Sequence, residues 1–403
     1  MEPTGPLKGI KIVELAMWAA GPMVAGILSD WGADVIKIEA PDGDPYRALN
    51  VHPGVQPADI TNPNFNVNNR NKRGMVLNLK TEEGRALARK LISGADVFLT
   101  NMRVGALERL GLDYDAMHQL SPRLIYCHVT GYGAEGEWRD RAGYDAGAFF
   151  ARAGVWSALL PQGDFPMMRC GAFGDYYTAL AAAGGICAAL VGRQATGKGQ
   201  RVLASLLRTG AYAISSALDQ ALLGYPVRSN ASRTPSFNPL INCYKDRDGK
   251  WFWLLCLQGD RFWPGVARAI GRPDLLNDQR FDSLDNRGRN SVALMEILDE
   301  VFKTRTVEEW GPIFDREDVW YTPANDIPGV LKDAQMRVAG CFTTMPTTRG
   351  DAEVVPAPID FSETPWNIRE AAPELGQHTE EILLEMGHSW EEIAKFKERG
   401  TIS

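Results

Sequence analysis

The sequence predicts an α/β domain built on a parallel sheet, followed by a smaller α+β domain. Near the start of the chain, Gly9–Leu15 and Ala33–Glu39 are β-branched segments typical of strands, and a helix is expected to open at Gly21-Pro22 between them. Strand and helix patterns continue to alternate as far as about Leu223, where the pattern changes. Regular alternation of strands and helices is typical of a parallel sheet.

The remaining elements of the first domain follow the same periodicities. Pro41–Asn71 is rich in proline, asparagine and aspartate and is predicted to be a long surface loop. Gly192–Gly199 resembles a phosphate-binding loop, but Gly199 replaces the required hydroxyl residue and the segment follows a helix, so a helix-to-strand turn is predicted. Further strands are predicted at Met75–Leu79, Asp96–Thr100, Leu124–Thr130 and Arg201–Leu206, and helices at Thr81–Ser93, Arg141–Gly154 and from Asp175 to near Gly192.

The pattern of the second half of the chain indicates a separate domain, followed by a segment that returns to the first domain. Pro239–Leu257 alternates around the turn residues Asp246–Gly249, which is typical of a β-hairpin. We place the first part of the large domain at 1–222, the small domain at 223–330 and a return segment that completes the large domain at 331–403. Helices are expected at Asp260–Ile270, Ser291–Lys303, Val307–Arg316 and Thr379–Glu398, with strand-like segments after Thr343.

Composition excludes several classes of function. The chain has 403 residues, is 45% hydrophobic and carries a formal net charge of −7, which disfavours a nucleic-acid partner. It lacks a signal-peptide pattern and a long uninterrupted apolar run, so no membrane association and a cytoplasmic location are expected. The six cysteines form no C-x-x-C pair and the five histidines show no ligand spacing, so no metal site is expected.

One carboxylate stands out, in the stretch CGAFGDYYTALAAAGG. Gly171 and Gly174 allow a tight turn, and Asp175 follows where an N-cap or first-turn residue of a helix would lie. A helix N-terminus favours the ionised carboxylate by a few tenths to about 1 kcal/mol. From these residues alone Asp175 is either a structural cap or a functional group. The small residues of Ala181–Gly185 predict close packing of this helix against another core element.

Other candidates for a site lie at the ends of predicted strands. Arg103 and Arg109 follow the strand that ends at Thr100, and guanidinium groups match phosphate oxygens, although a solvated helix face would use the same residues. Tyr144 and Asp145 are polar residues in an apolar setting, and form either the wall of a site or a helix cap. The first strand-to-helix turn lacks G-x-G-x-x-G, which gives a nicotinamide oxidoreductase little support.

The chain contains, in order, the blocks PLKGIKIVELA with AAGP, WGADVIKIEAPDGDPYR, NNRNKRGMVLNLKTEEGR, ADVFLTNMRVGALERLGLDY, VTGYGAEG, AFGDYYTALAA, TGKGQRVLASLL and LGQHTEEILLEMG. Together these blocks resemble the family III CoA-transferases, typified by formyl-CoA and carnitine CoA-transferases. The resemblance runs over nearly the whole chain, and the set of ordered blocks is more specific than any one block. RAGYDAGAFFARAG and NPLINCYKDRDGKWFWLLCL look most like the branch that acts on 2-hydroxy acids, such as phenyllactate and 2-hydroxyisocaproate CoA-transferases.

The resemblance implies roles for particular residues. Asp175 after Gly174 matches the family's nucleophilic aspartate. Tyr144 and Asp145 match a tyrosine–acid pair near the nucleophile. Contacts to coenzyme A are implied for Leu77, Lys80, Asn101, Met102, Arg103, Ala106 and Arg109, and positions bordering the thioester and its acyl group for Met17, Trp18 and Ala19.

The resemblance also implies a fold, an assembly and limits on the substrate. It implies a large Rossmann-like parallel-sheet domain, a smaller α+β domain and an interlocked homodimer. Ala40 stands where some members place an arginine against the adenine. The glycine-rich loop of formyl-CoA transferases is missing from Ser236–Tyr244, which argues against formyl or oxalyl substrates. Trp18, Phe149, Phe150 and Trp156 are candidates for an apolar acyl pocket, although such aromatic residues also serve in cores.

The implied reaction moves coenzyme A from an acyl-CoA thioester to a carboxylic acid through an aspartyl anhydride and an aspartyl-CoA thioester. Backbone N–H groups near Gly21 and Gly174 are candidate donors to the oxyanions. Two alternatives stay open. A racemase of the same fold would use a histidine where Tyr144 stands, and a phenol of pKa ~10 is a poor acid–base substitute for it. A non-catalytic CoA-binding protein would not need Asp175.

Overall fold

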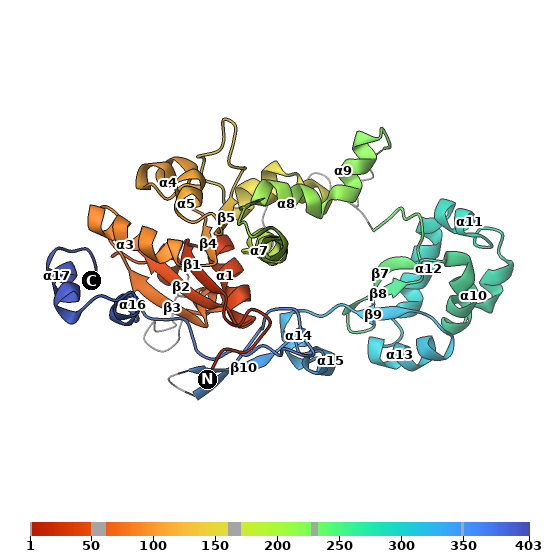
Figure 1. Ribbon diagram of the computed structural model, residues 1–403. Helices are drawn as coiled ribbons and strands as arrows, with labels where there is room; N and C mark the ends of the chain where they lie inside the picture. The colour runs from red at the N-terminus through yellow and green to blue at the C-terminus, as the bar shows by residue number, and fades with distance from the viewer. Residues whose placement is uncertain (1, 50–61, 160–170, 227–232, 348–349) are drawn as a thin grey trace. The chain divides into compact units, whose positions relative to one another are not determined.

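The computed structural model describes residues 2–49, 62–159, 171–226, 233–347 and 350–403, which form two compact units (Figure 1). The first unit comprises the described parts of Met1–Ala158, Phe165–Val227 and Gly340–Ser403. The second comprises the described parts of Leu159–Asp164 and Arg228–Ala339. The chain therefore leaves the first unit and returns to it at Gly340.

A parallel sheet forms the centre of the first unit, with the strand order β3-β2-β1-β4-β5-β6. Ile12 in the first strand pairs with Val35 on one side and Val97 on the other. All strands except the last are buried along nearly their whole length, because helices cover both faces of that part of the sheet. The predicted parallel α/β domain is confirmed. The strands are β1 (Lys11–Leu15), β2 (Asp34–Glu39), β3 (Lys72–Val76), β4 (Val97–Thr100), β5 (Ile125–Thr130) and β6 (Arg201–Ser205).

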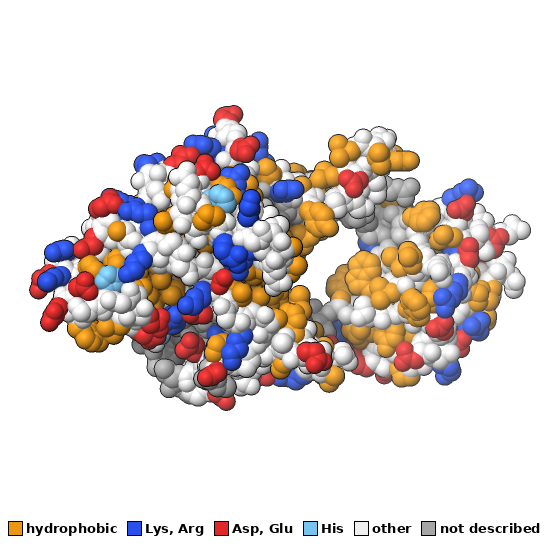
Figure 2. Space-filling model, viewed as in Figure 1, with side chains coloured by type: hydrophobic (Ala, Val, Ile, Leu, Met, Phe, Trp, Pro, Cys, Tyr) orange, Lys and Arg blue, Asp and Glu red, His pale blue; other side chains and the backbone are white. Residues whose placement is uncertain are grey.

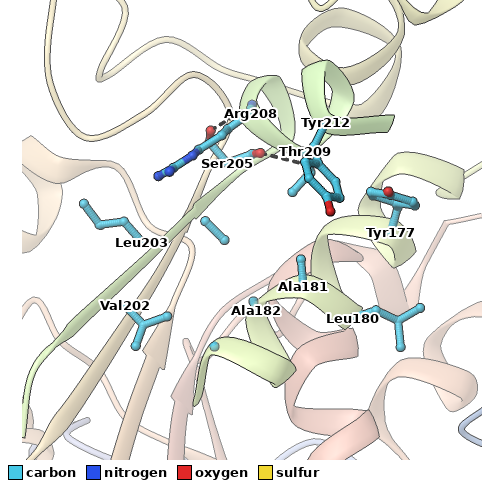
Figure 3. A pocket seen from close by; sticks show the side chains of 12 residues that line it. Tyr177, Leu180, Ala181, Ala182, Val202, Leu203, Ser205, Arg208, Thr209 and Tyr212 are labelled. Carbon is cyan, nitrogen blue, oxygen red and sulfur yellow. Dashed lines mark hydrogen bonds between the residues drawn. The ribbon is translucent and has the colours of Figure 1, made fainter. Parts of the chain in front are cut away.

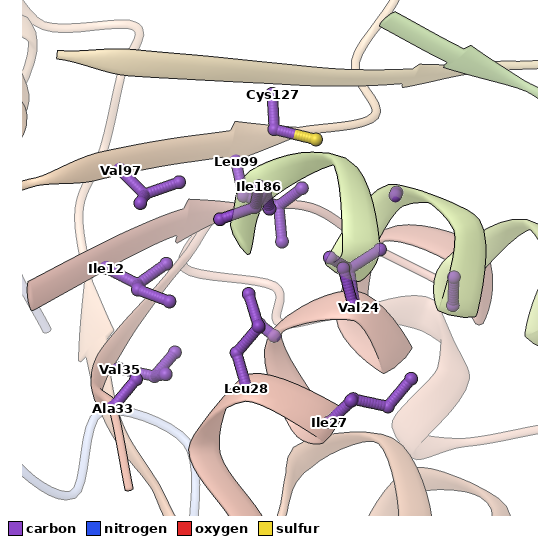
Figure 4. Close-up of a cluster of buried hydrophobic side chains, with 14 of the residues drawn as sticks. Ile12, Val24, Ile27, Leu28, Ala33, Val35, Val97, Leu99, Cys127 and Ile186 are labelled. Atoms are coloured by element: carbon purple, nitrogen blue, oxygen red, sulfur yellow. The ribbon is translucent and has the colours of Figure 1, made fainter. Parts of the chain in front are cut away.

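Alternate residues of each strand point into two separate cores. Val97 and Leu99 pack against α1 (Ala20–Asp30) and α7 (Phe173–Thr196) in the cluster of Figure 4. Phe98, between them, packs on the opposite face with Ile92. The helices contributing to that second core are α3 (Glu82–Ser93), α4 (Val104–Leu110), α5 (Tyr114–Leu120), α16 (Thr379–Glu385) and α17 (Trp390–Glu398).

Helix α7 is a core helix of the first unit. Its length and apolar composition would also suit a membrane-crossing helix, but Ala182, Ala183 and Ile186 are buried against α1 and the sheet. A Cβ atom at Gly185 would lie 3.0 Å from Val202 Cγ1 of β6, so the glycine permits this close approach. The helix continues to Thr196, and the predicted turn over Gly192–Gly199 is confined to its last residues, beginning at Gly197.

Several predicted elements differ from the structure, and the strand predicted at Met75–Leu79 lies at Lys72–Val76. The predicted loop Pro41–Asn71 contains a 3-10 turn, η1 (Pro45–Arg47), and a helix, α2 (Pro63–Asn69), while its residues 50–61 lie outside the described residues. Asn62 caps α2 through hydrogen bonds to two main-chain N–H groups, and Pro63 occupies its first turn. The single helix predicted at Thr379–Glu398 is two helices, α16 and α17, because Gly387 has a positive φ of 89° between them.

The remaining described elements of the first unit are one π-helix, three short α-helices and a β-hairpin. The helix predicted at Arg141–Gly154 is a π-helix, η3 (Asp145–Arg152), and Phe149 and Phe150 are buried in a core with Leu206. The other helices are α6 (Val155–Leu159), α8 (Leu206–Ala213) and α9 (Ser215–Leu222). A hairpin of β10 (Thr343–Thr347) and β11 (Gly350–Val354) lies in the return segment.

In the second unit, helices pack on a small antiparallel sheet, and this unit contains the predicted hairpin and helices. Tyr244 and Phe252 from the hairpin pack with Phe302 and Phe314 from two helices. Its elements are β7 (Ile241–Lys245), β8 (Trp251–Leu255), β9 (Tyr321–Pro323), α10 (Gly259–Ala269), η4 (Pro273–Asn277), α11 (Leu284–Arg289), α12 (Ser291–Phe302), α13 (Val307–Arg316), α14 (Ile327–Lys332) and α15 (Ala334–Val338).

Candidate active site

The site forms where the strand order of the sheet reverses, between the carboxyl ends of β1 and β4. Ligands of open parallel sheets bind in the crevice at such a switch point. The loop after β1 carries Met17, and Asn101 follows β4. The Asn101 side chain accepts a hydrogen bond from Met17 N (3.0 Å) and donates one to Met17 O (2.7 Å). Asn101 therefore holds the loop after β1 in place across the switch point. Because its side-chain oxygen and nitrogen both bond to Met17, the predicted contact of Asn101 with coenzyme A would have to use its main-chain atoms or further hydrogen bonds of the amide.

Trp18 is held in a strained conformation beside this loop. Its φ of 69° lies in the left-handed region, which is uncommon for a bulky residue. The Trp18 N–H donates to Asp44 Oδ1 at 3.1 Å, and the same oxygen accepts the N–H of Tyr46. Asp44 thus ties the loop after β1 to the turn after β2. Such outliers concentrate at functional sites, where the surrounding structure has to stabilise them.

A buried chain of charges supports Asp44. Lys37 Nζ donates to Asp44 Oδ2 and to Glu14 Oε1, both at 3.0 Å, and to Ala16 O at 2.9 Å. Glu14 also accepts from Lys72 Nζ at 2.6 Å. The side chains of Lys37, Lys72 and Glu14 are fully buried. Buried charges are tolerated when they are paired and hydrogen-bonded in this way. Removing one partner would leave the others as unpaired charges in the core, which destabilises the folded state.

Three aromatic rings meet at the site. Trp18 packs edge-to-face on Tyr46, with ring centroids 6.3 Å apart, and on Tyr144, at 5.9 Å. Tyr46 is buried in a small cluster with Ala19, and Trp18 and Ala172 pack against the same cluster. Ala172 is the N-cap residue of α7. The cluster therefore connects the loop after β1 to the start of the helix that carries Asp175.

Asp175 lies in the first turn of α7 and is half-buried. Ala172 adopts a left-handed conformation, with φ 60°, and turns the chain into the helix without a side-chain cap. The carboxylate of Asp175 accepts no hydrogen bond from the residues that the structure describes, so it is not a structural cap. Burial, and after it the charge of Asp145, raise the pKa of Asp175 to about 7.

Asp145 stands directly behind the start of α7. Its Oδ1 atom accepts the main-chain N–H of Gly174 at 3.1 Å, and its Oδ2 atom is buried without a partner among the described residues. Burial raises its pKa to about 6, against the opposing effect of its bonds to the N–H groups of Gly174 and Phe173. A Cβ atom at Gly174 would overlap this carboxylate and the Phe149 ring. Gly174 is thus required for the contact, and its N–H is not free to bind an oxyanion.

The residues that the resemblance assigns to coenzyme A lie after β3 and β4. Arg103 is the N-cap residue of α4, Ala106 and Arg109 follow within the helix at spacings of three residues, and both arginines are exposed. Met102 is half-buried, and its carbonyl lies 2.8 Å from His128 Nε2. Lys80 is exposed in the turn before α3, whereas Leu77 is fully buried in the core and offers only its backbone to a ligand.

Sequence reasoning missed two residues of this site, Asp44 and Tyr46. Both fall in the segment that was predicted to be a surface loop, where nothing in the local pattern distinguishes a buried tyrosine from an exposed one. The Asp44-Pro45 pair is a signal for a capped turn, because aspartate caps and proline opens helical turns. The fully buried Lys37 was also unrecognised, since a lysine in VIKIE is expected on the polar face of a strand.

A separate apolar groove of about 570 Å³ lies between α7, β6 and α8. Figure 3 shows Tyr177, Leu180 and Tyr212 on its walls, with Arg208 near one end. β6 is an edge strand of the sheet, and Leu203 on it is 38% exposed. Helix α9 follows and has no buried residue; Figure 2 shows hydrophobic side chains gathered over it.

Comparison with known proteins identifies the family of the chain. The (R)-2-hydroxy-4-methylpentanoate CoA-transferase of Clostridioides difficile is 35% identical, over 97% of this chain and 98% of the relative. The cinnamoyl-CoA:phenyllactate CoA-transferase of Clostridium sporogenes is 32% identical, over 98% and 96%. The crystal structure of a CAIB/BAIF family protein from Brucella suis covers 95% of this chain and 100% of its own, with a TM-score of 0.82 and 31% identity. Residues 7–379 match the family model, and the protein belongs to CoA-transferase family III.

Proposed function

We propose that this CoA-transferase uses Asp175 as its nucleophile. The observation that carries the proposal is a half-buried carboxylate without a hydrogen-bond partner among the described residues, placed at the start of α7 beside the switch point of the sheet. A carboxylate with a raised pKa is more basic than an exposed one, and its weaker solvation makes it a better nucleophile. The carboxylate of a structural cap, in contrast, accepts hydrogen bonds from backbone N–H groups.

The reaction then needs only one protein nucleophile. Asp175 attacks the thioester carbonyl of the donor, forming an aspartyl–acyl anhydride as the C–S bond breaks and the CoA thiolate leaves. The thiolate attacks the aspartyl carbonyl, the anhydride C–O bond breaks, and the donor acid leaves. Asp175 is now a CoA thioester. The acceptor carboxylate repeats these two steps in reverse, restoring Asp175 and forming the new acyl-CoA.

The acyl group is proposed to lie against the rings of Trp18, Tyr46 and Tyr144. One relative is named for (R)-2-hydroxy-4-methylpentanoate and the other for cinnamoyl-CoA and phenyllactate. These names suggest a 2-hydroxy acid and its enoyl-CoA here, including aryl acids such as phenyllactate with cinnamoyl-CoA. A planar acyl group suits a wall of aromatic rings. Phe149 and Phe150 do not belong to this wall, because these two residues of η3 are buried in a separate core with Leu206. Trp156, half-buried on α6, has no described contact with the three rings.

Coenzyme A is proposed to lie along the carboxyl ends of β3 and β4. The exposed guanidinium groups of Arg103 and Arg109 would pair with its phosphates, and Lys80 would supply a further positive charge. Double replacement of Arg103 and Arg109 by methionine should raise the KM for acyl-CoA well above that of the parent while leaving the KM for the acceptor acid nearly unchanged.

The active assembly is proposed to be a homodimer, as the family resemblance implies. The groove between α7, β6 and α8 and the exposed apolar side chains of Leu222 and Leu223 supply surface for a second copy. Light scattering should give twice the 44.4 kDa mass of the chain, and a monomer at micromolar concentration would contradict the proposal.

Asp175→Ala tests the function itself. A panel of acyl-CoA donors against acids with and without a 2-hydroxyl group should show transfer by the wild-type protein and none by Asp175→Ala, with acyl-CoA binding retained. Full transfer by the variant would overturn the assignment. A racemase would instead exchange the α-proton of an acyl-CoA in deuterated buffer without an acceptor acid. That exchange, in the absence of transfer, would favour the rival reaction.

A further inference from the structure

Tyr46 is a buried tyrosine whose hydroxyl group is accessible and has no partner among the described residues. The residue is 8% exposed, and its hydroxyl makes no hydrogen bond with the residues that the structure describes. Other buried tyrosines of the chain are satisfied. Tyr126 donates to Leu112 O at 2.8 Å, and Tyr244 donates to Pro239 O at 2.6 Å. The Tyr46 hydroxyl is not among the fully enclosed side-chain atoms that lack a partner, so it is accessible at this end of the sheet and can donate a hydrogen bond to a bound molecule.

The turn that carries Tyr46 is held at several points. Asp44 caps it through the Tyr46 N–H at 3.0 Å. The next residue, Arg47, forms two hydrogen bonds to the buried Glu39, of 2.9 and 2.6 Å. The Asn62 side chain donates to the carbonyls of Tyr46 and Arg47. A group fixed in this way loses little entropy when it binds, which is the condition for preorganised donors.

The Tyr46 ring lies beside the proposed nucleophile. It packs in one cluster with Ala172, three residues before Asp175, and edge-to-face on Trp18. Burial, followed by the negative charges of Asp175 and Asp44, raises the pKa of the phenol. The hydroxyl therefore keeps its proton at neutral pH and is a hydrogen-bond donor. Asp175 and Tyr46 are thus two polar groups without partners among the described residues, at the same end of the sheet.

The site needs such a donor. Negative charge develops on the carbonyl oxygen when Asp175 attacks the thioester, and the N–H of Gly174, one candidate from the sequence, is taken by Asp145. We propose that the Tyr46 hydroxyl donates a hydrogen bond to the acyl oxygen in this transition state. The O–H bond stays intact, and no proton is transferred. This inference rests on the proposed role of Asp175 and adds a second catalytic residue to it.

Tyr46→Phe tests the inference, because it keeps the ring and removes only the donor. Loss of one oxyanion donor costs about 100- to 1,000-fold in kcat in well-studied cases, and about 10- to 100-fold is expected where other donors contribute. The KM for acyl-CoA should stay within about threefold, since the hydrogen bond forms in the transition state. Mass spectrometry should still detect the CoA adduct on Asp175, formed more slowly.

Tyr126→Phe is the matched control. It also removes a buried hydroxyl from the same unit, but leaves Leu112 O unsatisfied in the core, so it should lower stability without lowering kcat. An unchanged kcat in Tyr46→Phe, or a rise in KM alone, would overturn the inference. Failure of the proposed function gives a different result, namely full transfer by Asp175→Ala or no Asp175 adduct in the wild-type protein.

Discussion

The Asp145 carboxylate accepts the main-chain N–H of Gly174, the residue directly before Asp175, at 3.1 Å. This contact places a second carboxylate behind the proposed nucleophile. Its charge adds to the effect of burial and raises the pKa of Asp175 to about 7. Since two nearby carboxylates resist being ionised together, the basicity of Asp175 depends on burial first and on the charge of Asp145 second.

Asp145→Asn should shift the pH dependence of the reaction to lower pH. In the wild-type protein, kcat/KM should fall below about pH 7, where Asp175 becomes protonated. The variant keeps an oxygen acceptor for Gly174 but loses the charge, so the pKa of Asp175 should fall and the acidic limb should move with it. Asp113→Asn, at the N-cap of α5, is the control for loss of a carboxylate that accepts a backbone N–H. An acidic limb that stays in place would contradict this coupling.

Asp175→Asn should stabilise the protein at alkaline pH. A carboxyl group whose folded pKa lies above its unfolded value makes the folded state bind the proton more tightly, so stability is lost as pH rises from about 4 through 7. Removing the ionisable group removes that loss, on the order of 1–3 kcal/mol after allowance for partial solvation. Urea unfolding at pH 8 and at pH 5 should show the gain to be larger at pH 8. A gain that grows on acidification would have the wrong sign.

Gly174→Ala should be destabilising although the residue lies in a helix. The new methyl group would overlap the Phe149 ring and the Asp145 carboxylate, and such overpacking costs about 1–3 kcal/mol. Gly184→Ala in the same helix is the control, since a Cβ atom there meets nothing within 4 Å and alanine favours the helix by about 0.5–1 kcal/mol. Thermal unfolding should therefore move in opposite directions for the two variants, and equal shifts would contradict the predicted clash.

Lys37→Met should cost far more stability than the loss of an exposed lysine. It leaves Asp44 and Glu14 buried with one partner fewer, at about 3–5 kcal/mol. Lys303→Met, which breaks an exposed pair with Glu300, should cost less than about 1 kcal/mol. Denaturant unfolding compares the two. Because Asp44 holds the Trp18 N–H, the variant should also change the tryptophan fluorescence response to acyl-CoA. Similar costs for both variants would show that the buried charges do not support the fold.

The parallel sheet was predictable because its strands repeat one signal, an apolar β-branched run, between amphipathic helices. The site was less predictable because its parts are brought together by the tertiary fold. Asp175 has the local sequence of a helix cap, and only the missing hydrogen bond distinguishes it from one. Tyr46 lies in a polar segment whose composition predicts exposure, yet the cap by Asp44 and the contacts of Trp18 bury it.

Buried charge was the other feature that local patterns could not reveal. Lys37 and Glu14 occupy strand positions where alternation predicts a solvated face, but helices cover both faces of a parallel sheet. Their burial depends on pairing with Lys72, which lies 58 residues after Glu14, and with Asp44, which lies 7 residues after Lys37 but outside the strands. The division of the last predicted helix was readable, because Ser389 and Glu392 form a capping box just after Gly387.

The central claim is that Asp175 itself carries coenzyme A during the reaction. The most direct measurement is mass spectrometry of the peptide containing Asp175 after the protein has been incubated with an acyl-CoA donor in the absence of an acceptor acid. The predicted result is a CoA thioester on Asp175 that disappears when an acceptor acid is added and is absent from Asp175→Asn. An unmodified Asp175 in a preparation that transfers CoA, or an adduct on another residue, would contradict the account.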